Sequence, residues 1–163
     1  MPTTTYTRTI AAPQQRIWEV VEDPHHIPRW WPGVTRVESV DDEHWTEVFI
    51  TKRGRPVRAD FHLIVSEPPW RRAWEQELAG TPFERVLDEA VTEIMLEPDV
   101  AGSTQVTIAE RQKLRGYSRT GGFMMRRANK RRLQEAMEGL GRACGADAED
   151  PGGDAPDRST ASS

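Results

Sequence analysis

The chain has 163 residues, of which 36% are hydrophobic and 29% charged, and its net charge is −4. These values predict one domain with a single hydrophobic core and exclude a disordered chain. A single cysteine excludes an internal disulfide and any multi-cysteine metal site. Since the chain has no apolar run long enough to span a bilayer and no signal-peptide pattern, we expect a cytoplasmic protein.

The negative charge is concentrated at the C-terminus. Residues 144–163 carry five acidic residues and one basic residue, among prolines, glycines and serines. Residues 1–143 carry 21 acidic and 21 basic residues and are neutral overall. We predict a folded domain at 1–143 and a disordered tail at 144–163, because the tail cannot bury enough apolar surface to offset the entropy of ordering it.

The first 30 residues predict one strand and two short helices. Residues 3–10 are rich in β-branched side chains, which favours a strand. A helix follows, opened by Pro13 and ended by Pro24, and a second is expected over 24–30. The apolar residues of the first helix share one side at helical spacing, with Trp18 on the flank: Ile17, Val20 and Val21.

The middle of the chain has the period-two alternation of strands, with turn residues between the segments. The expected strands are 34–40, 44–53, 56–66, 70–79, 86–97 and 103–114. Short connectors favour antiparallel neighbours, so these strands form a meander. Helical spacing returns over 120–143, with one stripe of small, apolar and amide side chains: Gly122, Met125, Asn129, Leu133, Ala136, Leu140 and Ala143.

Together these elements predict an α+β fold. The seven strands form a curved antiparallel sheet, and the two short helices follow the first strand. One face of such a sheet must be covered, and the C-terminal helix is the one predicted element long enough to cover it.

Several segments resemble a known family. They are residues 12–23 and 27–33, the Pro-Pro turn at 68–69 with Trp70 and Trp74, and the hairpin that joins 96–98 to 102–106. Over residues 3–143 the chain resembles the START-like superfamily, and more narrowly the bacterial polyketide cyclase/dehydrase and lipid transport (SRPBCC) family. The resemblance implies a helix-grip fold, in which the sheet wraps around the last helix and encloses an apolar cavity. Members bind lipids, polyketides or other hydrophobic molecules, and a minority are enzymes with no shared catalytic motif.

If such a cavity exists, strand and helix periodicity predict which side chains line it. From the sheet we expect Phe61, Leu63, Trp74, Ile94 and Ile108, and from the last helix Met125 and Leu133. The alternative is that these residues form a solid core. Of the adjacent Trp30 and Trp31, we expect one to seal the core and Trp31 to face the ligand.

Two polar residues interrupt apolar rows. Glu110 continues a strand face shared with Val106 and Ile108, and Asn129 lies within the apolar stripe of the last helix. A buried carboxylate or amide needs a hydrogen-bond partner, so both residues are candidates for orienting a mostly apolar ligand. The alternative places Glu110 at a solvated strand end, with Asn129 bound to backbone or water.

Other chemistries find little support. The four histidines lack metal-binding spacing, with His62 expected on the outer face of its strand, and Cys144 is expected at a frayed helix end. Phosphate-loop, dinucleotide and nucleophile-elbow motifs are missing, so we expect no metal and no cofactor. The basic run at 126–132 forms the solvated side of a helix, which predicts no nucleic-acid binding but allows transient membrane contact.

The leading hypothesis is therefore a protein that binds or transports a small hydrophobic or amphipathic ligand, as a monomer or weak dimer. The first alternative is a cyclase or dehydratase that acts on a polyketide-like substrate, with Glu110 or a nearby hydroxyl moving a proton. The second is a protein-interaction module that acts through the exposed Arg127, Lys130 and Arg131.

Overall fold

The computed structural model describes residues 3–116 and 119–145. The chain starts with β1 (Thr3–Ile10), α1 (Gln14–Val21), a 3-10 turn (Pro24–His26) and α2 (Ile27–Trp30). Six strands follow, and the chain then forms the long helix α3 (Arg119–Ala143). The strands are β2 (Val34–Glu38), β3 (His44–Ile50), β4 (Pro56–Glu67), β5 (Arg71–Gln76), β6 (Leu87–Pro98) and β7 (Thr104–Leu114). Short 3-10 turns precede β6 (Pro82–Arg85) and β7 (Val100–Gly102).

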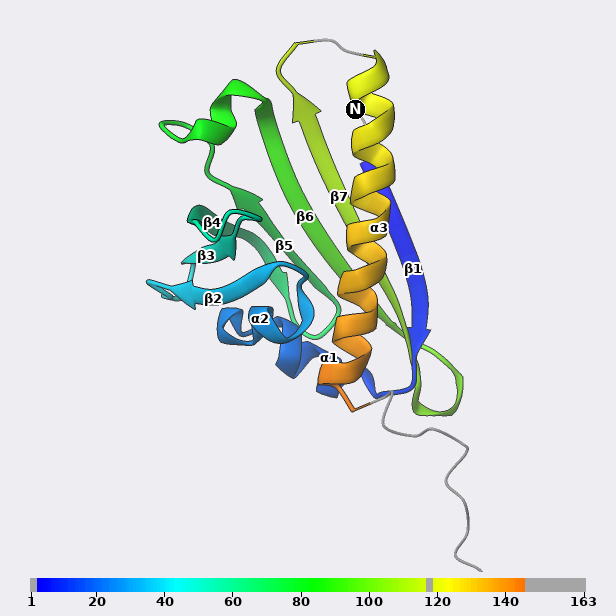
Figure 1. Ribbon diagram of the computed structural model, residues 1–163. Helices are drawn as coiled ribbons and strands as arrows, with labels where there is room; N and C mark the ends of the chain where they lie inside the picture. Colours follow the sequence, from blue (N-terminus) through cyan, green and yellow to red (C-terminus); the bar gives the residue numbers. More distant parts are fainter. Residues whose placement is uncertain (1–2, 117–118, 146–163) are drawn as a thin grey trace, which may run out of the picture.

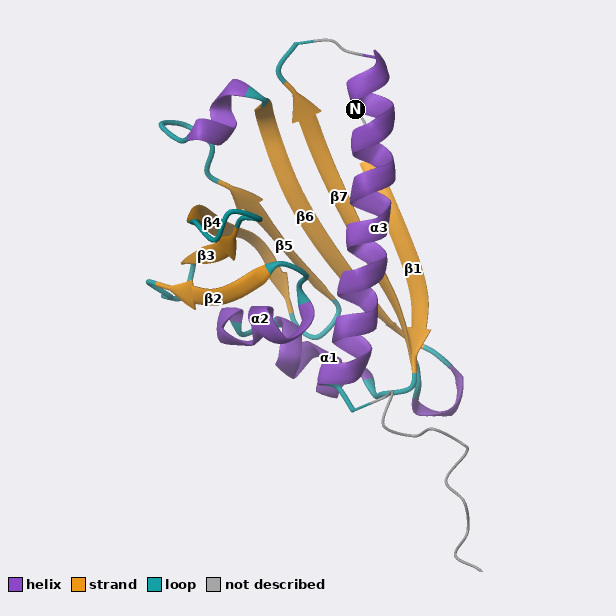
Figure 2. Ribbon diagram, viewed as in Figure 1, coloured by secondary structure: helices purple, strands orange, loops and turns teal. Residues whose placement is uncertain are grey.

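The strands form one antiparallel sheet in the order β1-β7-β6-β5-β4-β3-β2. The sheet bends strongly, and α3 lies across its concave face and packs against β1, β7 and α2 (Figure 1). Helices α1 and α2 lie together near the C-terminal end of α3 (Figure 2). The predicted α+β helix-grip architecture is confirmed.

The core lies where the apolar stripe of α3 meets the inner face of β6 and β7. Alternation along these strands turns Ile94, Leu96, Val106 and Ile108 inward, and all four are fully buried. The facing side chains of α3 are also fully buried: Leu133, Ala136, Met137 and Leu140. Met137 was missing from the predicted stripe, because the helix contacts both the sheet and α2 and so buries a wider face.

The N-terminal helices close one end of this core. Trp18 is buried rather than at the flank, and Trp30 is buried against Trp74 and Trp31. Helix α2 approaches α3 so closely that a Cβ on Gly139 would lie 2.4 Å from the Trp30 carbonyl oxygen. Only glycine allows the two backbones to come this close.

Several predicted bounds needed correction. β3 ends at Ile50 and β5 at Gln76, each three residues earlier than expected. For β3 the cause is a turn closed by the Thr51 N–H to the Arg55 carbonyl, with Gly54 at a positive φ of 75°. The second helix, expected over 24–30, is divided into a 3-10 turn and α2.

The prediction that Cys144 lies at a frayed helix end also needs correction. Cys144 is buried in the core, and its carbonyl accepts a hydrogen bond of 2.7 Å from Arg16 Nε. Burial raises the pKa of its thiol to about 11, so the thiol is protonated at neutral pH. From residue 146 onward, the predicted tail lies outside the described residues. Within the described ranges, no helix combines the length and apolar character that crossing a bilayer requires.

Candidate functional site

An internal cavity lies between the sheet and α3, with a volume of about 80 Å³. This corresponds to about two or three water molecules. Five apolar and six polar residues line it: Trp31, Phe49, Phe61, Trp74 and Ala90, and Glu47, Gln76, Thr92, Glu110, Gln112 and Arg132. The sequence predicted a mostly apolar cavity. The mixed lining corrects this expectation and leaves less room than predicted for a purely apolar ligand.

The aromatic side of the cavity is a set of rings that contact one another, two pairs edge to face and one pair stacked. The ring centroids of Trp31 and Trp74 are 6.4 Å apart, and those of Trp74 and Trp45 are 6.2 Å apart. Phe61 stacks on Trp45 at 6.1 Å, because the two residues are paired across β3 and β4. Rings that brace one another in this way hold a rigid wall with little freedom to rotate.

The polar side is a hydrogen-bonded network between β7 and α3. Arg132 Nη2 donates to Glu110 Oε1 at 2.5 Å and to Asn129 Oδ1 at 3.0 Å. Asn129 Nδ2 donates to Gln112 Oε1 at 2.8 Å, and Gln112 Nε2 donates to Glu110 Oε1 at 3.2 Å. Glu110 is 6% exposed and so does not lie at a solvated strand end, which corrects the alternative for this residue. Asn129 hydrogen-bonds to the side chains of Gln112 and Arg132.

Two buried atoms of this network are left without a partner among the described residues. They are Glu110 Oε2 and Arg132 Nε. A buried polar atom without a hydrogen bond costs about 1–3 kcal/mol. A polar ligand atom placed in the cavity would satisfy one of them, so the network is suited to receive a ligand.

Glu47 adds a second carboxyl to the cavity. It lies on β3, is 3% exposed, and accepts a hydrogen bond of 3.2 Å from Trp45 Nε1. The pKa of Glu47 is raised to about 7, mainly by burial and in smaller part by the nearby Glu110, while the Trp45 hydrogen bond and Arg132 oppose the shift. Its carboxyl therefore changes charge close to neutral pH, which is common at functional sites.

The predicted site residues fall into two groups. Trp31, Phe61, Trp74 and Glu110 line the cavity. The other six do not line it. Ile94, Ile108 and Leu133 are fully buried in the core, and Leu63 packs against the core. Met125 is half-buried, and Asn129 contacts the cavity-lining Gln112 through a hydrogen bond. Ligand contact stays a prediction for all ten residues.

Sequence reasoning missed Glu47 and Arg132. Glu47 lies on the same face of β3 as Trp45 and Phe49, because every second residue of a strand points to the same side. The argument that selected Glu110, a polar residue in an apolar row, would therefore have selected Glu47 as well. Arg132 follows Asn129 by three residues and therefore shares its side of the helix, but it was counted with the solvated basic run. Its guanidinium turns inward, where Nη2 hydrogen-bonds directly to the Glu110 carboxylate.

A surface groove lies outside the cavity, and Arg132 lines both. The groove has a volume of about 750 Å³. It runs between α3 and the turn before β2, and its lining is Pro32, Gly33, Met124, Arg127, Ala128, Arg131, Arg132 and Glu135. Arg132 thus forms the partition between an exposed groove and an internal polar cavity.

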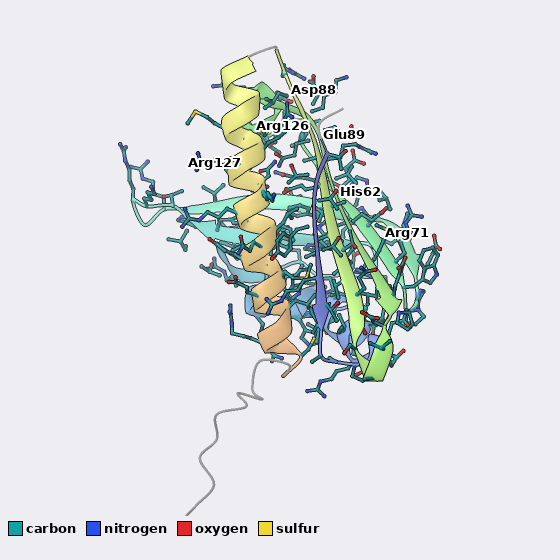
Figure 3. The ribbon with its side chains drawn as sticks, turned by 90° about the vertical axis from the view of Figure 1, so that its right-hand side faces the viewer. His62, Arg71, Asp88, Glu89, Arg126 and Arg127 are labelled. Atoms are coloured by element: carbon teal, nitrogen blue, oxygen red, sulfur yellow. The ribbon has the colours of Figure 1, made fainter. Side chains whose placement is uncertain are left out.

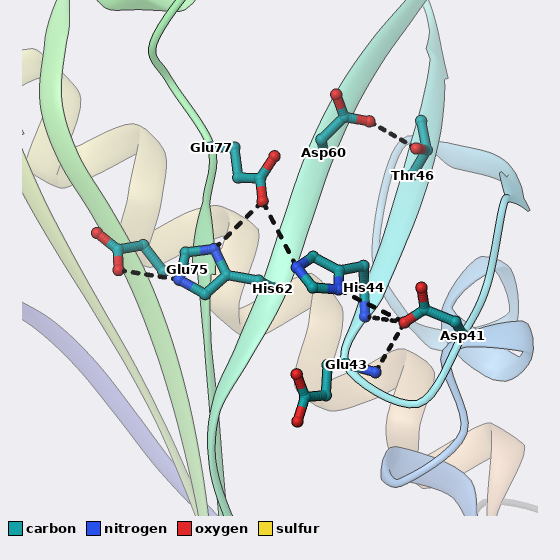
Figure 4. A network of polar contacts seen from close by, with 8 residues as sticks. All are labelled: Asp41, Glu43, His44, Thr46, Asp60, His62, Glu75 and Glu77. Atoms are coloured by element: carbon teal, nitrogen blue, oxygen red, sulfur yellow. Dashed lines mark hydrogen bonds and ion pairs between the residues drawn. The ribbon is translucent and has the colours of Figure 1, made fainter.

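A second polar cluster lies on the opposite, outer face of the sheet. His62, like Arg71, points away from α3 (Figure 3). His62 lies 3.5 Å from Glu75 and 3.6 Å from Glu77, and His44 lies 3.5 Å from Asp41 (Figure 4). In the described part of the chain, no three acidic, histidine or cysteine residues come together as metal ligands would. These contacts lie on the outer surface, away from the cavity.

Comparison with known proteins gives the family. Residues 1–145 match the family described as Polyketide cyclase / dehydrase and lipid transport, within the SRPBCC superfamily. The chain belongs to this family. No match is found among curated proteins.

The polyketide cyclase/dehydrase fold recurs in solved structures. The Zhui aromatase/cyclase from Streptomyces sp. R1128 is 15% identical, with a TM-score of 0.72, over 94% of this chain and 99% of that one. The di-domain aromatase/cyclase (ARO/CYC) BexL of the BE-7585A biosynthetic pathway is 19% identical, with a TM-score of 0.72, over 88% of this chain and 46% of that one. A conserved protein from Geobacillus kaustophilus is 14% identical, with a TM-score of 0.71, over 88% of this chain and 95% of that one. These similarities establish a shared fold.

Proposed function

We propose that this protein binds a small amphipathic molecule, with its polar group in the cavity beneath α3, as a cytosolic monomer or weak dimer. One observation carries the proposal: an aromatic wall faces a buried polar network in which Glu110 Oε2 has no partner among the described residues. Aromatic surface supplies affinity through burial, and a few placed polar groups supply orientation. Membership of a family described for lipid transport is in accord with it.

The size of the cavity indicates how much of a ligand it receives. Its 80 Å³ is well below the roughly 300–1,000 Å³ typical of pockets that enclose a drug-sized ligand. The cavity therefore suits a polar head or a single small ring. A longer apolar part would lie in the groove of about 750 Å³ on the other side of Arg132.

Binding is tested with benzyl alcohol and dodecan-1-ol, followed by the indole N–H signals in NMR spectra. We expect the Trp31 and Trp74 signals to shift. Trp31→Ala should weaken binding about tenfold, because about 1–2 kcal/mol of ring contact is lost. Trp70→Ala is the matched control, since Trp70 is 45% exposed and does not line the cavity.

If neither molecule shifts the Trp31 or Trp74 signal, the proposed function is wrong. The alternative, a cyclase or dehydratase, draws support from Glu47, whose pKa of about 7 suits proton transfer. Offering a synthetic poly-β-ketone thioester distinguishes the two: a binding protein returns it unchanged, whereas an enzyme releases a cyclised or dehydrated product.

A further inference from the structure

The charges that line the cavity do not balance once Glu47 is ionised. Glu110 and Arg132 neutralise each other across their 2.5 Å contact. Glu47 is the other charged residue of the lining, and its hydrogen-bond donor, Trp45, is neutral. Arg72 does not line the cavity. Its guanidinium carbon lies over the Trp45 ring, 5.8 Å from the ring centroid, and its charged neighbours are Glu22 and Asp23. One negative charge is therefore left for a ligand to match.

The aromatic wall favours the same kind of ligand. Trp31, Phe61 and Trp74 line the cavity together with Glu47. The face of an aromatic ring carries partial negative charge and attracts a cation within about 6 Å. A site that combines several rings with an unpaired carboxyl is suited to an ammonium group, whereas it would repel an anion.

We infer that the ligand carries a positively charged ammonium group, which sits between Glu47 and the rings of Trp31 and Trp74. This inference rests on the proposed function and narrows it to small organic cations. The unpartnered Glu110 Oε2 supplies a second acceptor for an N–H or O–H of the same ligand. An apolar substituent of the cation would extend past Arg132 into the surface groove.

Binding of a cation must depend on pH. The groups that face Glu47 are Trp45 on its own strand, Glu110 on β7 and Arg132 on α3. Without a ligand, the Glu47 carboxyl holds its proton up to about pH 7, because it is buried. A bound cation lowers its pKa, so the proton is released on binding. Cation affinity therefore rises as the pH increases through 7.

The experiment uses two molecules of nearly the same shape, choline and 3,3-dimethylbutan-1-ol, in which carbon replaces the charged nitrogen. Isothermal titration measures both Kd values at about pH 6 and about pH 8. At the higher pH, choline is expected to bind about tenfold more tightly than the alcohol. At the lower pH this preference should shrink severalfold, while the alcohol binds equally well at both.

Variants assign the preference to Glu47. Glu47→Gln should remove the preference for choline over the alcohol. Glu38→Gln is the control, because Glu38 lies on β2, pairs with Arg36 and Arg58, and does not line the cavity. If Glu47→Gln does not fold, the pH dependence of the choline preference in the unaltered chain decides whether the inference holds.

Each outcome has one meaning. Binding of the alcohol with equal or weaker binding of choline at about pH 8 overturns the cation inference and leaves the proposed function intact. A preference for choline that survives Glu47→Gln also overturns the inference. If neither molecule binds at either pH, the inference fails, while the proposed function is decided separately by the shifts of the Trp31 and Trp74 signals with benzyl alcohol and dodecan-1-ol.

Discussion

Glu47 is the single residue whose surroundings most affect the chemistry of the site. Its carboxyl is 3% exposed and accepts one hydrogen bond, from Trp45 Nε1, among the described residues. Burial favours the neutral acid, and Glu110 on the facing strand has the same effect. The protein therefore holds a proton at Glu47 that the unfolded chain would release.

This raised pKa makes the stability of the fold depend on pH. The folded pKa of about 7 exceeds the ordinary value of 4.5, so the stabilisation is complete below about pH 4.5 and is lost as the pH rises through 7. Relative to Glu47→Gln, the wild type should lose about 2–3 kcal/mol of unfolding free energy between about pH 5 and pH 8. Urea unfolding at both pH values measures the difference.

Glu38→Gln serves as the control for this prediction. Arg58 and Arg36 lower the pKa of the Glu38 carboxyl, so it is already ionised throughout this pH range. The unfolding free energy of Glu38→Gln should change with pH in the same way as that of the wild type. Parallel curves for Glu47→Gln and the wild type would show that Glu47 does not titrate near neutral pH.

At the scale of elements, the contact between α2 and α3 sets the position of the long helix. The backbone at Gly139 meets the Trp30 carbonyl, and the Trp30 ring packs against Trp31 and Trp74 of the aromatic wall. The position of α3 therefore also determines how far Arg132 reaches into the cavity. Glycine at this point of the helix gives up some helix propensity in exchange for close packing.

Gly139→Ala should accordingly destabilise the protein. Alanine favours a helix by about 1 kcal/mol over glycine. Its Cβ, however, would lie 2.4 Å from the Trp30 oxygen and 2.9 Å from Trp30 Cα, and backbone atoms cannot move aside cheaply. We expect a net loss of about 2 kcal/mol in urea unfolding. Gln134→Ala, at an exposed position of α3, should change stability little, and a stabilised Gly139→Ala would contradict the packing argument.

At the scale of the whole molecule, one charged contact ties the long helix to the sheet that it covers. Arg132 of α3 and Glu110 of β7 meet inside the fold, and Asn129 and Gln112 complete the network. Removing one partner leaves the other charge buried and uncompensated, which is more harmful than removing both. The network thus favours a single placement of α3 on the sheet.

Arg132→Met should reduce the unfolding free energy by about 2 kcal/mol. The loss is smaller than for a fully buried pair, because the Arg132 side chain is 38% exposed. The double variant Arg132→Met with Glu110→Gln should recover about half of it. A double-mutant cycle measured by urea unfolding gives the coupling, and simple additivity of the two losses would show that the pair does not interact.

The sequence by itself determined the strand and helix order, the covered face of the sheet and the polar positions at Glu110 and Asn129. These follow from periodicity and turn residues, which act over a few neighbouring positions. Only the tertiary structure decided that Glu47 and Arg132 join Glu110 at one small cavity, while Ile94 and Ile108 pack into solid core. The register of β3 against its neighbours and the close approach at Gly139 bring these residues together, and both depend on contacts between segments far apart in the chain.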